Sequence, residues 1–261
     1  MTEKEYILTY ILNCSRADLY AGNFAQKDNL DSELSQILAR RKNGEPVQYI
    51  TGRVEFMGLE FKVDRGALIP RPETEILAEE AIKIAQGSRR KAKNIMDIGT
   101  GSGNIVISLA KNLPNCKFSA VDISVDAIQV AKENAVLNNV EDRIEFIVSD
   151  LFSGIETNNQ FDLIVSNPPY IVSTELDSLP PEVKCEPRLA LDGGRDGLDF
   201  YRRIIKEITA YLRKGGVLLM EIGFNQASPI REILEASENL QILQIIKDYS
   251  NIERVIILER V

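Results

Sequence analysis

The chain of 261 residues is predicted to have an α/β fold built on a doubly wound sheet of seven strands. Helical and strand patterns alternate from Glu73 onward, which favours a mainly parallel sheet with helices on its faces. The link over residues 248–251 is too short for a crossover helix, so the last strand is expected to pair antiparallel with the preceding one. The first part of the chain predicts a small helical domain and a β-hairpin.

The N-terminal region contains two stretches with apolar residues at helical spacing, residues 3–13 and 31–42. Gly44 and Pro46 follow the second stretch and are typical of helix ends. We therefore expect a helical domain over residues 1–52.

Apolar residues alternate on both sides of Met57-Gly58, which predicts a β-hairpin. The hairpin and a linker over residues 53–72 are expected to join the helical domain to an α/β domain over residues 73–261. The strands expected in that domain are residues 94–98, 117–121, 143–148, 161–165, 216–222, 241–246 and 254–258. The helices expected between them include residues 104–112, 124–137, 200–212 and 225–236.

A glycine-rich loop follows the first expected strand of the sheet and consists of Gly99, Thr100, Gly101, Ser102 and Gly103. Glycine lets the backbone turn sharply and approach a ligand closely, because it has no β-carbon. A dinucleotide-binding loop would have its last glycine where this chain has Asn104, so a nicotinamide cofactor is disfavoured. The loop indicates a nucleoside cofactor bound against backbone.

Two further strand ends complete the expected cofactor site. Asp122 and Ile123 follow the second strand, and the Asp122 carboxylate is well placed to accept hydrogen bonds from two ribose hydroxyls. Asp150 and Leu151 follow the third strand, where a carboxylate and amides could meet an adenine edge. Because parallel strands end at one edge of a sheet, all three segments are expected to converge on one nucleoside.

The tetrapeptide Asn167-Pro168-Pro169-Tyr170 follows a fourth apolar strand and indicates methylation of a planar nitrogen. The Asn167 side-chain carbonyl and the Pro168 main-chain carbonyl can accept hydrogen bonds from both N–H groups of an amide-like NH2. Two successive prolines stiffen the turn and leave carbonyls as its polar groups. Tyr170 is expected to lie against the flat substrate group, and an ordinary strand-ending turn is the alternative.

Composition restricts the possible functions. The chain has no histidine, which excludes a histidine base or metal ligand, and its three cysteines have no metal-ligand spacing. A net charge of -8 disfavours a protein that follows a phosphate backbone, and the basic cluster over residues 88–93 is interpreted as a solvated linker. We expect a cytoplasmic protein with no membrane span, no metal and no direct nucleic-acid contact.

These motifs together resemble those of the class I methyltransferases that use S-adenosylmethionine. Within that group, the chain is similar to the protein-(glutamine-N5) methyltransferases that modify peptide chain release factors. The resemblance covers nearly the whole chain and includes three stretches that a generic methyltransferase lacks: Pro46 to Gly52, Ile69 to Glu75, and Glu186 to Leu191 followed by Gly193-Gly194 and Asp196-Gly197-Leu198.

The resemblance implies methyl transfer to the glutamine of a Gly-Gly-Gln loop in release factors. It implies a cofactor site over Gly99 to Gly103, Asp122, Ile123, Asp150, Leu151 and Asn167, and a substrate site over Asn167 to Tyr170 with Asn167, Pro168 and Tyr170 in catalysis. The helical domain is expected to help recognise the partner. Adenine-N6 or guanine-N2 methylation of nucleic acid is the enzyme alternative, and a nucleoside-binding module without catalysis is the third possibility.

Overall fold

The computed structural model describes residues 2–87, 92–157 and 160–261, so residues 88–91 of the basic cluster lie outside the described part. Its centre is a seven-stranded sheet with the order β5-β4-β3-β6-β7-β9-β8. The strands are β3 (Asn94–Ile98), β4 (Lys117–Asp122), β5 (Ile144–Val148), β6 (Phe161–Ser166), β7 (Leu212–Glu221), β8 (Leu240–Lys247) and β9 (Glu253–Arg260). Strand β9 is antiparallel to both of its neighbours, which confirms the predicted ending of the sheet.

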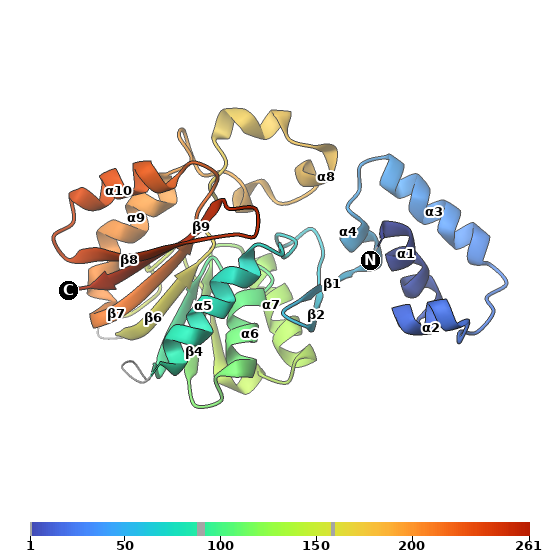
Figure 1. Cartoon of the computed structure of the whole chain (residues 1–261), viewed down its shortest axis with the longest axis horizontal. Coiled ribbons are helices and arrows are strands. Elements are labelled where there is room, and N and C mark those ends of the chain that lie inside the picture. Colours follow the sequence, from blue (N-terminus) through green and yellow to red (C-terminus); the bar gives the residue numbers. More distant parts are fainter. Residues whose placement is uncertain (1, 88–91, 158–159) are drawn as a thin grey trace.

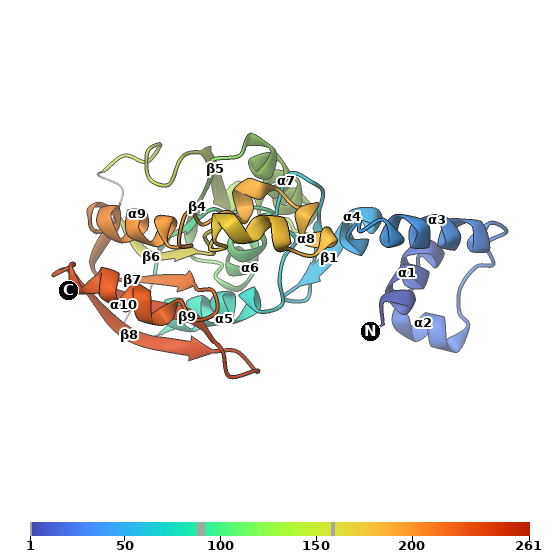
Figure 2. The ribbon, with the colours of Figure 1, turned by 90° about the horizontal axis from the view of Figure 1, so that it is seen from above.

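Helices cover both faces of the sheet, and each face has its own hydrophobic core (Figures 1 and 2). One core joins the sheet to α5 (Thr74–Gln86), α6 (Asn104–Asn112) and α7 (Val125–Leu137). The other joins it to α9 (Asp199–Glu207) and α10 (Ala227–Glu235). Alternate residues of one strand serve the two cores, as Ile95 and Met96 of β3 do. This arrangement confirms the doubly wound fold.

The predicted helix over residues 200–212 was wrong at its C-terminal end. Helix α9 ends at Glu207 and a 3-10 turn over Ile208–Ala210 follows, so Leu212 already belongs to β7. Ile208 in the 3-10 turn and Leu212 in β7 are both fully buried. Apolar residues at these positions would also suit the buried face of a longer helix, so the apolar pattern does not mark the end of α9. Gly215, with a φ of 73°, lies inside β7 at a position where the sequence suggested the strand had not begun.

The four N-terminal helices lie at one end of the molecule (Figure 1), and the first, third and fourth of them share a separate small core. They are α1 (Glu3–Leu12), α2 (Arg16–Ala21), α3 (Leu30–Lys42) and α4 (Val47–Thr51). The helices predicted over residues 3–13 and 31–42 are confirmed, whereas α2 and α4 were not anticipated because they are only one to two turns long. None of the described helices is long and apolar enough to cross a bilayer.

The predicted β-hairpin is formed by β1 (Arg53–Phe56) and β2 (Leu59–Lys62). Met57 and Gly58 form its turn with φ of 52° and 71°, the left-handed values that suit a tight hairpin. Helix α7 holds the hairpin through the buried Asn134, whose Oδ1 accepts from Lys62 N at 2.7 Å. Asn134 Nδ2 donates to Lys62 O at 3.0 Å and to Ser102 O at 2.9 Å. One amide therefore joins the hairpin to the glycine-rich loop.

Replacing Asn134 with alanine should lower the free energy of unfolding by about 2–4 kcal/mol, because the buried Ser102 carbonyl and the part-buried Lys62 N–H and C=O lose their partner. Urea denaturation measures the change. The matched control is Gln129→Ala on the exposed side of the same helix, which should change stability by less than about 0.5 kcal/mol. Similar stabilities of the two variants would contradict the bridging role of Asn134.

Candidate active site

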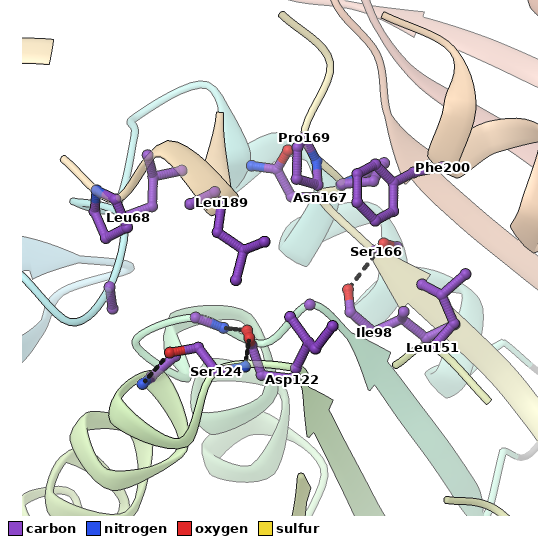
Figure 3. Close-up of a pocket in the computed structure, with 18 of the residues that line it drawn as sticks. Leu68, Ile98, Asp122, Ser124, Leu151, Ser166, Asn167, Pro169, Leu189 and Phe200 are labelled. Carbon is purple, nitrogen blue, oxygen red and sulfur yellow. Dashed lines mark hydrogen bonds between the residues drawn. The ribbon is translucent and has the colours of Figure 1, made fainter. Parts of the chain in front are cut away.

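A cavity of about 290 Å3 lies at the carboxyl ends of β3, β4, β5 and β6 (Figure 3). The strand register makes these ends level: Ile98 pairs with Val121 on one side and with Ser166 on the other, and Asp122 pairs with Val148. A crevice at this edge is the usual ligand site of an open α/β sheet. Two segments outside the sheet, residues 66–68 and 187–190, also contribute to the wall.

The glycine-rich loop contributes backbone to the cavity. Gly99 and Thr100 both donate N–H groups to Val121 O at 2.9 Å, which ties the loop to the end of β4. Gly99 and Gly101 line the cavity and have φ of 70° and 55°. A side chain at either position would be strained and would project from a surface that a ligand needs bare. The loop therefore presents main-chain groups to the cavity, and the nucleoside predicted to bind against them stays a prediction.

Asp122 is held by two backbone N–H groups. Its Oδ2 accepts from Gly101 N and its Oδ1 from Ser124 N, both at 2.9 Å. Burial raises the pKa of Asp122, and these N–H donors act in the opposite direction. Each carboxylate oxygen has more than one acceptor site, so both retain capacity toward the cavity. Ile123 lines the cavity next to Asp122 and is half exposed.

Asp150 and Leu151 line a neighbouring part of the wall. Asp150 Oδ1 lies 2.8 Å from Arg203 of α9, so the carboxylate has a protein partner that the sequence did not suggest. The Arg203 guanidinium also lies 5.9 Å from the centre of the Phe200 ring. Both α9 residues line the cavity, and Phe200 adds an aromatic wall.

The Asn167 turn lies across the cavity from Asp122 (Figure 3). Asn167, Pro168 and Pro169 all line the cavity, and Asn167 Nδ2 donates to Thr74 Oγ1 at 3.2 Å. Among the described residues, none donates a hydrogen bond to Asn167 Oδ1 or to the Pro168 carbonyl oxygen. The turn therefore presents two acceptors without an intramolecular donor.

Gly193 packs directly behind this turn. A β-carbon at position 193 would lie 2.7 Å from Tyr170 Cα and 2.9 Å from Pro169 O, which is closer than real contacts allow. Gly193 N also donates to Ile171 O at 2.8 Å. The glycine pair in the sequence thus lets a second segment support the turn at backbone distance.

The described residues that line the cavity do not include four of the predicted site residues. Thr100 donates to the buried Asp97 at 2.7 Å, and Ser102 donates to Asn104 at 3.2 Å. Gly103 starts α6 with a φ of 80°, and a β-carbon there would lie 2.9 Å from the Ile107 side chain. These three residues therefore stabilise the conformation of the loop through contacts on the side that faces the protein interior.

Tyr170 is the fourth predicted site residue that does not line the cavity. Its ring packs against the core on the α9 side, and its hydroxyl lies 3.5 Å from Glu221 Oε1. Burial and the Glu221 charge hold its pKa above the ordinary value. Its predicted stacking on a flat substrate group stays a prediction.

The two segments outside the sheet are joined by the buried carboxylate of Glu186. Glu186 pairs with Arg71, and its Oε2 accepts from Ile69 N at 3.0 Å. Tyr49 of α4 packs against Ile69 and donates its hydroxyl to Ala67 O at 2.8 Å. The stretches over residues 46–52, 69–75 and 186–191, which the sequence analysis singled out, therefore all contribute to one structure around the cavity.

Several lining residues were missed by the sequence analysis, namely Leu68, Leu189, Phe200 and Arg203. Leu189 is half exposed and its side chain extends into the cavity (Figure 3). Leu189 belongs to the stretch from Glu186 to Leu191, so the resemblance over that stretch could have indicated that it lies at the site. Arg203 gave none, because its helical spacing is that of an ordinary surface residue.

The fold and the cavity define a class I methyltransferase. A family model described as a methyltransferase domain matches residues 89–255. The solved structure of the hMettl16 catalytic domain is 18% identical, covers 83% of both chains and superposes with a TM-score of 0.64. At that identity the likeness shows the fold.

Sequence relatives define the family more closely. The PrmC N-terminal domain model matches residues 2–52. A release factor glutamine methyltransferase from Koribacter versatilis is 42% identical over 97% of this chain and 89% of its own length. One from Geobacter sulfurreducens is 44% identical over 87% of this chain and 78% of its own length. The chain belongs to the release factor glutamine methyltransferase family, which confirms the resemblance seen in the sequence.

Replacing Glu186 with alanine should lower the free energy of unfolding by about 3 kcal/mol, because it leaves Arg71 without its charge partner and the Ile69 N–H unsatisfied. The matched control is Glu182→Ala, which removes an exposed carboxylate 3.2 Å from Arg41 and should cost less than about 1 kcal/mol. Urea denaturation compares the two variants. Equal losses would contradict a special role for the buried pair.

Proposed function

We propose that this protein transfers a methyl group from S-adenosylmethionine to the side-chain amide nitrogen (N5) of the glutamine in the Gly-Gly-Gln loop of release factors. The transfer would tune translation termination in the cytoplasm. The observation that carries the proposal is the pair of free acceptors, Asn167 Oδ1 and Pro168 O, on the cavity wall. A primary amide has two N–H groups and needs two such acceptors. Family membership supports the same reaction.

The cavity fits a nucleoside methyl donor. Gly99 and Gly101 leave the wall bare of side chains, and Asp122 has acceptor capacity for two ribose hydroxyls. Ile123 and Leu151 add apolar surface suited to the faces of an adenine ring. Asp150 is expected at the adenine edge, although its pairing with Arg203 means that it acts there together with a cation. Thr100, Ser102 and Gly103 would hold the loop in this shape.

The chain's own residues orient the nucleophile. S-adenosylmethionine supplies a methyl group that its sulfonium already activates, so positioning and exclusion of water are the main tasks of the protein. Asn167 and Pro168 hold the amide N–H groups and direct the nitrogen lone pair away from them. As the nitrogen attacks, its N–H groups become more acidic and both hydrogen bonds strengthen, which favours the transition state. The surplus proton then leaves to solvent.

No strong base is needed for this reaction, and the composition agrees. The chain contains no histidine, and the acceptors at the turn are neutral carbonyls. An aspartate at position 167 would suit a more basic nitrogen. The neutral turn therefore matches an amide.

Methylation of adenine N6 or guanine N2 is the second candidate, because an exocyclic amino group also presents two N–H donors. A nucleic-acid substrate would require a base to be flipped out and a cationic surface for the phosphates. The net charge of -8 disfavours that surface.

An acceptor comparison tests the proposed function. The protein is incubated with methyl-labelled S-adenosylmethionine and, separately, with release factor, duplex DNA and ribosomal RNA. Label is expected in the release factor, at the glutamine of its Gly-Gly-Gln loop. Label in DNA or RNA alone would favour the second candidate, and donor binding without any transfer would favour a binding module.

Removal of the Asn167 acceptor should slow methyl transfer. We expect Asn167→Ala to lower the single-turnover rate by about a hundredfold or more, because a preorganised acceptor used in the transition state is lost. Donor affinity, measured by calorimetry, should be nearly unchanged. Asn115→Ala, on an exposed turn, is the matched control and should behave as wild type. A near-normal rate for Asn167→Ala would exclude the proposed role.

We further propose that the N-terminal helices provide a second contact surface for the release factor. A single glutamine side chain offers little area, whereas stable protein interfaces bury about 800 Å2 on each partner. The helices contact the segment that continues into the cavity wall: Arg41 lies 3.2 Å from Glu182, and Gly44 packs on Pro181. A partner held on this surface would therefore lie close to the Asn167 turn.

A full-length variant tests the second surface. Tyr10, Tyr20 and Leu38 are large hydrophobic residues of these helices that are exposed in the described structure. Replacing all three with serine should lower kcat/KM on intact release factor at least about tenfold, with little change on a short Gly-Gly-Gln peptide. Val136→Ser, an exposed change on α7, is the control. Equal losses on protein and peptide would mean that the triple change disturbs the catalytic domain instead.

A further inference from the structure

Thr74 lies between Asn167 and a buried carboxylate that the proposed mechanism does not use. Its hydroxyl donates to Glu221 Oε2 at 2.6 Å and accepts from Asn167 Nδ2 at 3.2 Å. Thr74 and Glu221 are only 2% and 1% exposed. Thr74 is the first residue of α5, and Glu221 is the last residue of β7. The three side chains form a chain of hydrogen bonds that begins in the core and ends at the cavity.

The direction of these hydrogen bonds follows from the chemistry of each group. An ionised carboxylate only accepts, so the single hydroxyl proton of Thr74 is directed to Glu221. The Thr74 oxygen then has only lone pairs for Asn167, which must meet it with its NH2 group. The Asn167 amide is thereby fixed with Oδ1 on the side away from Thr74. In the opposite orientation, a lone pair would face a lone pair.

This orientation determines what the turn can bind. With Oδ1 free, Asn167 accepts an N–H from the substrate amide beside the Pro168 carbonyl. With the amide reversed, the turn would present one donor and one acceptor, and the substrate NH2 would meet an N–H group. The amide orientation therefore decides whether the acceptor pair exists.

We propose that Thr74 and Glu221 are positioning residues that fix the Asn167 amide in the orientation required for methyl transfer to glutamine. The inference rests on the proposed function and adds two residues to its machinery. Neither residue is among the described residues that line the cavity, so both act through Asn167. The buried hydrogen bond from Thr74 to Glu221, continued to Asn167, holds one geometry before the substrate arrives.

The surroundings of Glu221 are consistent with this role. Its neighbours are Thr74 and Glu73 at α5, Tyr170 after β6, Tyr201 of α9 and Arg254 of β9. Burial raises the pKa of Glu221 to about 7, against the hydrogen bond from Thr74 and the charge of Arg254. The carboxylate form that orients Thr74 is therefore the dominant form above neutral pH. The test is best made at about pH 8.5, where ionisation is nearly complete.

The first test compares two changes at position 74. Thr74→Val keeps the shape and removes the hydroxyl, whereas Thr74→Ser keeps the hydroxyl. Thr74→Val should lower the single-turnover rate on release factor about tenfold with an unchanged dissociation constant for S-adenosylmethionine, because Asn167 loses its fixed orientation. Thr74→Ser should stay within about twofold of wild type. A normal rate for Thr74→Val, or an equal loss for both variants, would overturn the proposal.

A double variant separates positioning from general damage. If Thr74 acts only through Asn167, the combined Thr74→Val and Asn167→Ala protein should be as slow as Asn167→Ala alone. Losses that multiply would show that Thr74 acts by another route and would overturn the proposal. Glu221→Leu offers an independent entry to the same network, since it removes the carboxylate to which the Thr74 hydroxyl donates. It should reproduce the Thr74→Val pattern, and a normal rate would count against the proposal.

The wild-type protein distinguishes this inference from the proposed function. Failure of wild type to label release factor would reject the function itself. Normal labelling by wild type together with a normal Thr74→Val rate would reject only the positioning role.

Discussion

The cavity wall depends on one buried carboxylate, that of Glu186. Removing a carboxylate from water is expensive, and the charge is tolerated only where cationic and N–H partners are fixed around it. Arg71 and the Ile69 N–H provide those partners from a segment more than a hundred residues earlier in the chain. Because both segments must be in place for the charge to be satisfied, the pair sets the position of residues 66–68 and 187–190 together.

Polar groups on other parts of the cavity wall are also held by fixed hydrogen bonds. Asp122 is oriented by the N–H groups of Gly101 and Ser124, and Asn167 is oriented by Thr74. Gly193 supports the proline turn through backbone contact alone. Each group that faces the cavity thus has its bonds to the protein on one side and free acceptor capacity on the other.

The sequence predicted the parts of the site that lie at strand ends. An apolar run indicates the strand, and the polar or glycine-rich segment after it indicates where the strand ends. This reasoning placed Gly99, Asp122 and Asn167 at one cavity. It could not place Phe200 or Arg203, which reach the cavity from a helix face whose direction depends on tertiary packing. It also could not separate the end of α9 from the start of β7, since buried apolar residues such as Ile208 and Leu212 suit a helix as well as a strand. For Tyr170 the sequence predicted a place in the site, but its position in the tetrapeptide did not reveal that its ring packs toward the core.

Two parts of the cavity wall differ in how widely other α/β proteins share them. The glycine loop and Asp122 belong to a strand-end architecture that many α/β proteins share. The other part is made by residues 66–68, 187–190 and the Asn167 turn, which depend on Arg71, Glu186, Thr74 and Gly193. Arg71 and Thr74 lie three residues apart in one stretch, and they contact two different buried carboxylates, Glu186 and Glu221. Because Glu186 holds the wall segments and Glu221 holds Thr74 beside Asn167, that short stretch couples the shape of the wall to the orientation of the acceptor.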